Sequence, residues 1–126
     1  MTTNSRRLVM AACLSTCASL LVPAAAQAQT PAWPTKAIRF VVPFAPGGTS
    51  EVVARSVAAE LTKQLGQSVY VENKPGGAGV TAMQEVARAV PDGHTIILTH
   101  VGTLAVNPYM LSNQPYDVNK DFVPVT

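Results

Sequence analysis

Cysteine is nearly absent from this chain, and that scarcity removes two structural options. The 126-residue sequence contains two cysteines, Cys13 and Cys17, and both fall in an N-terminal segment that we expect to be removed. The remaining sequence has no thiol, so it offers neither a disulfide framework nor a cysteine metal site. Lipid attachment to one cysteine is an alternative, but neither follows a good lipobox, since residues 10–12 read MAA and residues 14–16 read LST.

An excess of charge of one sign is also missing. The chain carries nine basic and seven acidic residues, but two of the basic ones, Arg6 and Arg7, belong to the same N-terminal segment. The remaining seven basic residues balance the seven acidic ones, so the expected mature chain is neutral. A neutral chain gives no reason to expect nucleic acid or an anionic membrane as a partner.

No hydrophobic run has the length of an ordinary membrane span. Residues 8–22 are apolar apart from small hydroxyl residues, whereas a transmembrane helix needs about 20 apolar residues. With Arg6-Arg7 before this run and the cleavage motif Ala26-Gln27-Ala28 after it, residues 1–28 are predicted to be a secretory signal peptide. Cleavage after Ala26, a short membrane anchor and twin-arginine export through Ser5-Arg6-Arg7 are the alternatives.

Beyond a Pro-rich leader at residues 29–36, the hydrophobic pattern predicts alternating strands and helices. Short apolar runs of β-forming residues predict strands, and apolar residues spaced by three and four predict one-sided helices. Thr49 or Ser50 is expected to cap the first helix, and Gly66 is expected to end it. The expected strands cover 37–42, 68–72 and 94–99, the helices cover 49–65 and 80–90, and a short helical turn covers 105–111.

This order, β-α-β-α-β, predicts an α/β fold over residues 37–121 in which a parallel sheet carries helices on both faces. Ligands of open parallel sheets bind beyond the carboxyl ends of the strands. Loops 43–51, 73–80 and 99–103 fall at those ends and are therefore the candidate ligand-binding loops. Residues 122–126 read as the start of a further strand, so we expect the chain to be a fragment of a longer protein.

The first of these loops lacks the lysine that a Walker A phosphate loop requires. Gly47-Gly48 is followed by Thr49-Ser50-Glu51, and the Glu51 carboxylate would repel a triphosphate. What remains is a set of backbone N–H groups and hydroxyls at a helix N-terminus, which suits a small anion, either carboxylate or phosphate. The alternative is that the two glycines only make a tight turn.

The second loop matches part of a dinucleotide-binding fingerprint. Residues 77–82, GAGVTA, have the pattern G-x-G-x-x-A between a strand and a helix. However, residues 73–76 lengthen the turn, and Thr99-His100-Val101 stand where that fold places an acidic residue. A nucleotide-linked enzyme therefore remains only an alternative.

Residue patterns typical of catalytic or metal-binding sites are sparse. His100 is a lone histidine at an expected strand end, and His94 is expected to be a solvated residue at the start of the third strand. Glu51 in a first helical turn is typical of favourable helix electrostatics. No Ser-His-Asp order, carboxylate pair or G-x-S-x-G elbow is present, so we expect no enzyme activity, no cofactor and no metal.

Taken in order, four stretches resemble one protein family. VPFAPGGTSEVVAR at 42–55, VYVENKPGGAGVTA at 69–82, PDGHTIILTHVGTLAVNP at 91–108 and PYDVNKDFVPV at 115–125 are similar in order and spacing to the N-terminal part of Bug-type proteins. These proteins are the periplasmic solute receptors of tripartite tricarboxylate transporters. The resemblance covers nearly all of residues 33–126.

The resemblance implies a two-domain, periplasmic-binding-protein-like receptor of the Venus-flytrap kind, with a cleft for a small carboxylate. It implies a periplasmic monomer whose partners are membrane components of a tripartite transporter, and residues 122–126 would start the crossover to a missing second domain. Family members usually carry Asp where Glu51 stands, which leaves the role of this acid open. The implied ligand-binding residues, acting through main-chain N–H groups, hydroxyls and ordered waters, are Phe44, Gly47, Gly48, Thr49, Glu51, Gly77, Ala78, Gly79, Thr99, Gly102 and Thr103.

The resemblance leaves the particular ligand open. Dicarboxylates, citrate, amino acids, aromatic acids and nicotinate-like molecules all offer a carboxylate to backbone donors. If the chain is a fragment, the alternative outcome is a truncated product that binds nothing, because half of the cleft is missing.

Overall fold

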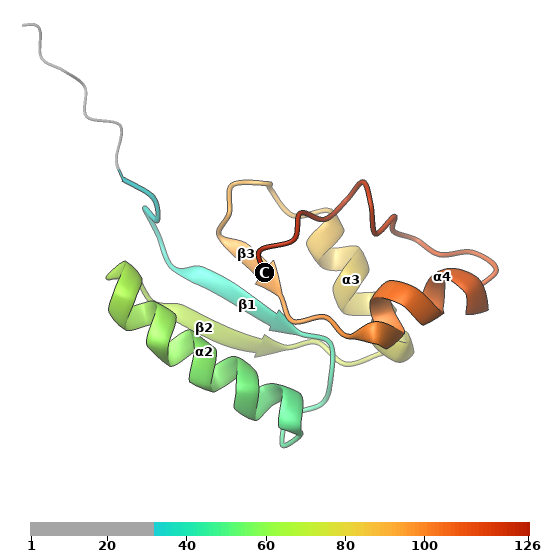
Figure 1. Cartoon of the computed structure of the whole chain (residues 1–126), viewed down its shortest axis with the longest axis horizontal. Coiled ribbons are helices and arrows are strands. Elements are labelled where there is room, and N and C mark those ends of the chain that lie inside the picture. Colours follow the sequence, from blue (N-terminus) through green and yellow to red (C-terminus); the bar gives the residue numbers. More distant parts are fainter. Residues whose placement is uncertain (1–31) are drawn as a thin grey trace, which may run out of the picture. The chain divides into compact units, whose positions relative to one another are not determined.

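The computed structural model describes residues 32–126, which form a parallel sheet with helices packed against it (Figure 1). The strands are β1 (Ile38–Val42), β2 (Val69–Asn73) and β3 (Thr95–Ile97). Both strand pairs are parallel, and the order across the sheet is β2-β1-β3. The predicted α/β fold is therefore confirmed, whereas the predicted signal peptide at residues 1–28 lies outside the described residues.

Two helices, α2 (Thr49–Leu65) and α3 (Val80–Ala87), connect the strands and lie on opposite faces of the sheet. Successive side chains of a strand point to opposite faces. In β1, Phe40 joins the apolar cluster on the α2 side, whereas the neighbouring Arg39 pairs with Glu85 of α3. Right-handed crossovers require this arrangement, because β1-α2-β2 moves to one side of β1 and β2-α3-β3 returns past it to the other.

The larger core lies between α2 and the sheet. Ala54 and Ala58 are the buried residues of α2, and their small side chains allow the helix to approach the strands closely. The sheet contributes Ile38, Phe40, Val42 and Val69 to the same cluster. On the α3 side, Val41, Ala82 and Met83 are fully buried, and burying a side chain as large as valine or methionine stabilises the fold by about 1.5–3 kcal/mol.

The ends of α2 confirm its predicted stop but not its predicted cap. Gly66 adopts a left-handed φ of 67°, and its N–H donates to the Thr62 carbonyl, as expected of the residue just beyond a helix. The capping residue at the start is Gly48, and it makes no side-chain hydrogen bond. The prediction of a Thr49 or Ser50 cap was wrong, because both residues already lie inside the first helical turn.

The segment after β3 contains the helical turn predicted at 105–111, but the turn begins earlier than expected. A π-helical turn, η3 (Gly102–Val106), begins inside the predicted loop 99–103 and continues directly into α4 (Asn107–Met110). Residues 122–126, which were expected to start a further strand, are in neither a helix nor a strand. Across residues 32–126, no helix has the length and apolar character needed to cross a membrane.

Candidate ligand-binding site

The loops that follow the three strands meet at one place. A β-carbon added to Gly79, between β2 and α3, would lie 2.6 Å from Thr103 Cγ2 and 3.4 Å from Pro43 Cβ. Thr103 belongs to the segment after β3, and Pro43 directly follows β1. Glycine is required at position 79, because the φ of 89° is left-handed and a contact of 2.6 Å leaves no room for a side chain. The predicted gathering of loops at the carboxyl ends of the strands is therefore present.

This meeting point lies where the connections of the sheet diverge. The chain leaves β1 towards β2 through α2, whereas β3 pairs with the other edge of β1. After β3 the chain still follows β1, since the Leu98 N–H donates to the Val41 carbonyl at 2.9 Å, and it then turns into η3 and α4 (Figure 1). In open parallel sheets such a switch point is where ligands bind.

Glu51 of α2 holds the first loop in place. Its Oε2 accepts a hydrogen bond from the Gly47 N–H at 2.5 Å, and its Oε1 accepts one from Arg55 Nε at 2.7 Å. These contacts, with that from the Gly47 amide the strongest, keep the pKa of the Glu51 carboxyl below its usual range. The Gly47 amide, predicted to bind a ligand carboxylate, is thus already engaged by a carboxylate of the protein. The amides of Thr49 and Ser50 have no intrahelical acceptor and stay suited to an anion.

The second loop has a left-handed backbone that is supported from α4. Gly77, Ala78 and Gly79 have φ values of 52°, 53° and 89°, and within residues 32–126 Ala78 is the one non-glycine residue with a positive φ. A left-handed alanine costs roughly 1–2 kcal/mol. Asn107 Nδ2 donates to the Ala78 carbonyl at 3.1 Å. Backbone strain that the surroundings maintain in this way is typical of ligand sites.

The third loop is organised by His100 and Thr103. Thr103 is fully buried, and its hydroxyl donates to the His100 carbonyl at 3.0 Å. The His100 ring stacks on Phe44 of the first loop, with ring centroids 4.7 Å apart and ring planes 17° apart. This aromatic pair joins the first loop to the third. The Thr103 hydroxyl therefore supports the loop internally, and its direct contact with a ligand stays a prediction.

Exposure divides the predicted ligand-binding residues into groups. Gly79 and Thr103 are buried and support the meeting of the loops. The half-buried ones are Phe44, Glu51, Thr99 and Gly102, and the exposed ones are Gly47, Gly48, Thr49, Gly77 and Ala78. The three loops together form the wall of the candidate site, and the exposed group is the part of it that a ligand can reach. Contact with a ligand stays a prediction for each residue.

Several side chains that position these loops were missed by the sequence analysis. Asn73 Nδ2 donates to the Phe44 carbonyl at 3.0 Å, and the buried Tyr116 hydroxyl donates to the Thr103 carbonyl at 2.8 Å. Asn107 belongs to the same group, whereas His100 was noted in the sequence, but only as a lone histidine at a strand end. Asn73 ends a strand beside a glycine-rich loop, which is a usable signal, but nothing near Tyr116 in the sequence indicates its partner.

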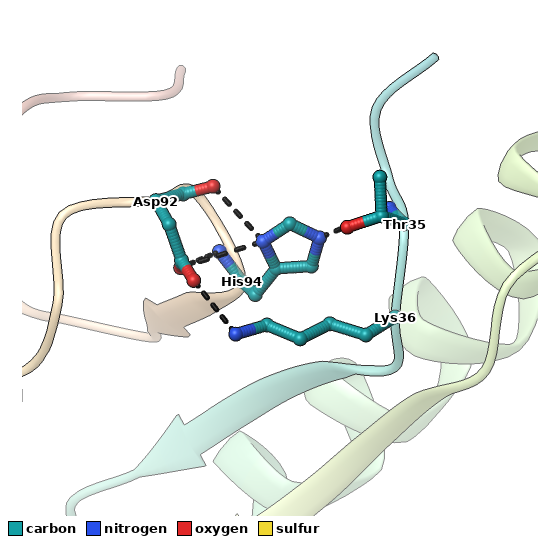
Figure 2. A network of polar contacts seen from close by, with 4 residues as sticks. All are labelled: Thr35, Lys36, Asp92 and His94. Carbon is teal, nitrogen blue, oxygen red and sulfur yellow. Dashed lines mark hydrogen bonds and ion pairs between the residues drawn. The ribbon is translucent and has the colours of Figure 1, made fainter. Parts of the chain in front are cut away.

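A second polar cluster lies at the opposite, amino end of the strands (Figure 2). His94 is 6% exposed, its Nε2 accepts from the Thr35 N–H at 3.2 Å, and its Nδ1 lies 2.9 Å from the Asp92 carbonyl oxygen. The prediction of a solvated His94 was therefore wrong, because the protein itself provides partners for both ring nitrogens. Lys36 Nζ lies 2.7 Å from the Asp92 carboxylate, and this contact, followed by the His94 N–H, lowers the pKa of Asp92 to about 2.

An open cavity of about 320 Å³ adjoins this amino-end cluster. Its two cations are both paired, Lys36 with Asp92 and Arg39 with Glu72 and Glu85. The cluster therefore ties the leader to the turn before β3 and leaves no free positive charge for a ligand. Across residues 32–126, no group of three or more His, Cys, Asp or Glu side chains is placed to hold a metal ion.

The fold defines an α/β domain of the periplasmic-binding-protein class. The periplasmic binding protein BugD is 41% identical with a TM-score of 0.70, and the match covers 74% of this chain and 31% of BugD. MatC from Rhodopseudomonas palustris, solved with bound malate, is 43% identical with a TM-score of 0.71, over 74% of this chain and 32% of MatC. The R. palustris protein solved with adipate is 38% identical with a TM-score of 0.66, over 69% and 29%.

The family follows from a match over more than half of the chain. Residues 53–126 match the family described as tripartite tricarboxylate transporter family receptor. The chain therefore belongs to this receptor family, and the Bug-type resemblance is confirmed. The chain spans about a third of the length of the curated relatives that it matches.

Proposed function

We propose that this protein is a periplasmic receptor for a small carboxylate, in the first place a dicarboxylate, and that it serves a tripartite tricarboxylate transporter. Family membership supports the receptor role, and two similar structures hold the dicarboxylates malate and adipate. The predicted signal peptide at residues 1–28 supports a periplasmic location. The observation that carries the proposal is the meeting of three strand-end loops, rich in hydrogen-bond donors, at the switch point of the sheet.

The proposed wall can bind an anion with neutral groups alone. The first-turn amides of α2 carry partial positive charge, and hydrogen bonds to an ionised acceptor are the strong ones. A buried, unpaired arginine would be costly whenever the site is empty, and neutral donors avoid that cost. Binding followed by release needs no nucleophile or general base, so we propose no enzyme activity.

Thermal unfolding against a panel of small acids tests the proposal. The panel contains malate, adipate and citrate, with NAD(P)H as the probe for the dinucleotide alternative. Adipamide is the matched neutral control, because it has the length of adipate without its charge. A ligand at about 100 times its Kd stabilises the folded state by roughly 2.7 kcal/mol. We expect such a shift with at least one of the three acids and none with adipamide or NAD(P)H.

A chimaeric protein tests the same loops within a chain of the length of the relatives. Because the chain spans about a third of its relatives' length, the panel is repeated on a chimaera in which residues 33–126 replace the matching segment of MatC. The proposal predicts that this chimaera binds a dicarboxylate. Stabilisation by NAD(P)H alone, or no stabilisation of either protein by any acid of the panel, contradicts the proposal.

A further inference from the structure

His100 offers the site a hydrogen-bond donor that its isolated position in the sequence did not indicate. Its Nδ1 accepts the Gly102 N–H at 2.7 Å and lies 3.4 Å from the Thr103 nitrogen. A ring nitrogen that accepts a hydrogen bond carries no proton, so the proton of the neutral imidazole is on Nε2. Nε2 is therefore a donor, and it makes no hydrogen bond with any residue in the range 32–126.

The direction of this donor is set by two neighbours. One face of the His100 ring stacks on Phe44 at a centroid distance of 4.7 Å. The edge with Nδ1 and Cε1 lies against Gly102, where an added β-carbon would clash with Cε1. Glycine at position 102 thus makes room for the imidazole. The side chain is held in this way although the residue is exposed, so a ligand can reach it without displacing a protein partner.

The ring also lies beside the loops of the proposed wall. Phe44, its stacking partner, leads into the exposed Gly47–Thr49 segment. The His100 carbonyl accepts from the Thr103 hydroxyl, and Thr103 is the residue that lies against Gly79. Contacts within this chain therefore hold the Nε2–H group of His100 beside all three loops.

We propose that the Nε2–H of His100 donates a hydrogen bond to the ligand carboxylate, which makes His100 a specificity-determining residue for ionised acids over their neutral amides. This inference rests on the proposed receptor function and names one more group in the same site. A hydrogen bond to an ionised acceptor is roughly twice as strong as one between neutral groups, which is the source of the discrimination.

Two substitutions separate this role from a merely structural one. In His100→Asn, the side-chain oxygen takes the place of Nδ1 and accepts the Gly102 N–H, but the Nε2–H is gone. In His100→Phe, the stack on Phe44 is kept while both nitrogens are lost. Titration calorimetry at pH 7 gives the Kd for malate and for adipate, and we expect both variants to raise it roughly 10- to 100-fold. Each variant keeps one of the two contacts that hold the ring, the Gly102 hydrogen bond or the Phe44 stack, so a loss of affinity common to both is assigned to the missing Nε2–H.

A third variant moves the ring without changing its chemistry. Gly102→Ala places a methyl group where Cε1 lies, so the imidazole must turn away, and we expect a comparable loss of affinity. His94→Gln is the control, because His94 lies at the opposite end of the strands and its replacement should leave the Kd unchanged. In the wild type, the ¹⁵N resonance of His100 Nε2 should shift on adding adipate and stay in place with adipamide.

The outcomes distinguish the two proposals. If the wild type binds a dicarboxylate and His100→Asn binds it equally well, His100 only shapes the turn, and this inference is overturned while the receptor function stands. If neither the wild type nor the chimaera binds any acid of the panel, both proposals fail. Weaker binding by both His100→Asn and His100→Phe supports both.

Discussion

Replacing Gly79 with alanine perturbs the point where the three loops meet, and Gly47→Ala is its matched control. The two glycines have nearly the same φ, 89° and 91°, so an alanine at either position must adopt a left-handed φ. Their surroundings differ. A β-carbon at position 47 has nothing within 4 Å, whereas one at position 79 lies 2.6 Å from Thr103 Cγ2 and 3.4 Å from Pro43 Cβ.

The size of each effect follows from this comparison. A left-handed alanine costs roughly 1–2 kcal/mol, and that should be nearly the whole loss in the free energy of unfolding for Gly47→Ala. At position 79 the clash with Thr103 adds an overpacking cost of about 1–3 kcal/mol, which brings the loss to about 2–5 kcal/mol. In a domain of this size, each 1 kcal/mol lowers the melting temperature by about 4–8 °C.

Urea unfolding followed by circular dichroism measures both variants against the wild type. The informative quantity is the difference between the two losses, because subtraction removes the shared backbone penalty. The structure predicts that Gly79→Ala loses at least about 1 kcal/mol more than Gly47→Ala. Equal losses would refute the reasoning, since they would mean that the loops after β1, β2 and β3 do not meet at Gly79.

Two further predictions concern polar contacts. Asp92 has a folded-state pKa of about 2 against an ordinary value of 3.8, so its contacts with Lys36 and His94 stabilise the fold above about pH 4 and lose that effect as the pH falls towards about 2. The difference in melting temperature between wild type and Asp92→Asn should therefore shrink over that interval, and a constant difference would contradict this assignment. Tyr116→Phe removes the 2.8 Å hydrogen bond to the Thr103 carbonyl and should lower the free energy of unfolding by roughly 1–3 kcal/mol, because a buried acceptor is left without its donor. An unchanged urea midpoint would show that this bond is absent.

The local elements could be predicted from sequence because their signals are local. Helix α2 has the predicted bounds, Thr49–Leu65, since its apolar spacing and the glycine at position 66 are both visible in one window. The strand order was not predicted, because it depends on which edges of β1 are paired. The capping prediction failed by one residue, and a shift of that size is enough to place Thr49 and Ser50 inside the helix.

The site was predictable in position but not in detail. The topology alone places the three loops at the carboxyl ends of the strands. The contacts inside the site join distant parts of the chain, as in the stack of Phe44 on His100. The same holds at the other end, where His94 bonds to Thr35, 59 residues away. A single sequence carries no pattern for such pairs, so the burial of His94 and the orientation of His100 had to come from the structure.

The central claim is that the loops after β1, β2 and β3 form a wall that binds a carboxylate. The most direct measurement is the change in backbone amide chemical shifts of the ¹⁵N-labelled protein as adipate is added. We expect changes concentrated at residues 44–49, 77–79 and 100–103, with none caused by adipamide. Changes confined to the amino-end cluster around Asp92 and His94, or no change with adipate, malate or citrate, would contradict it.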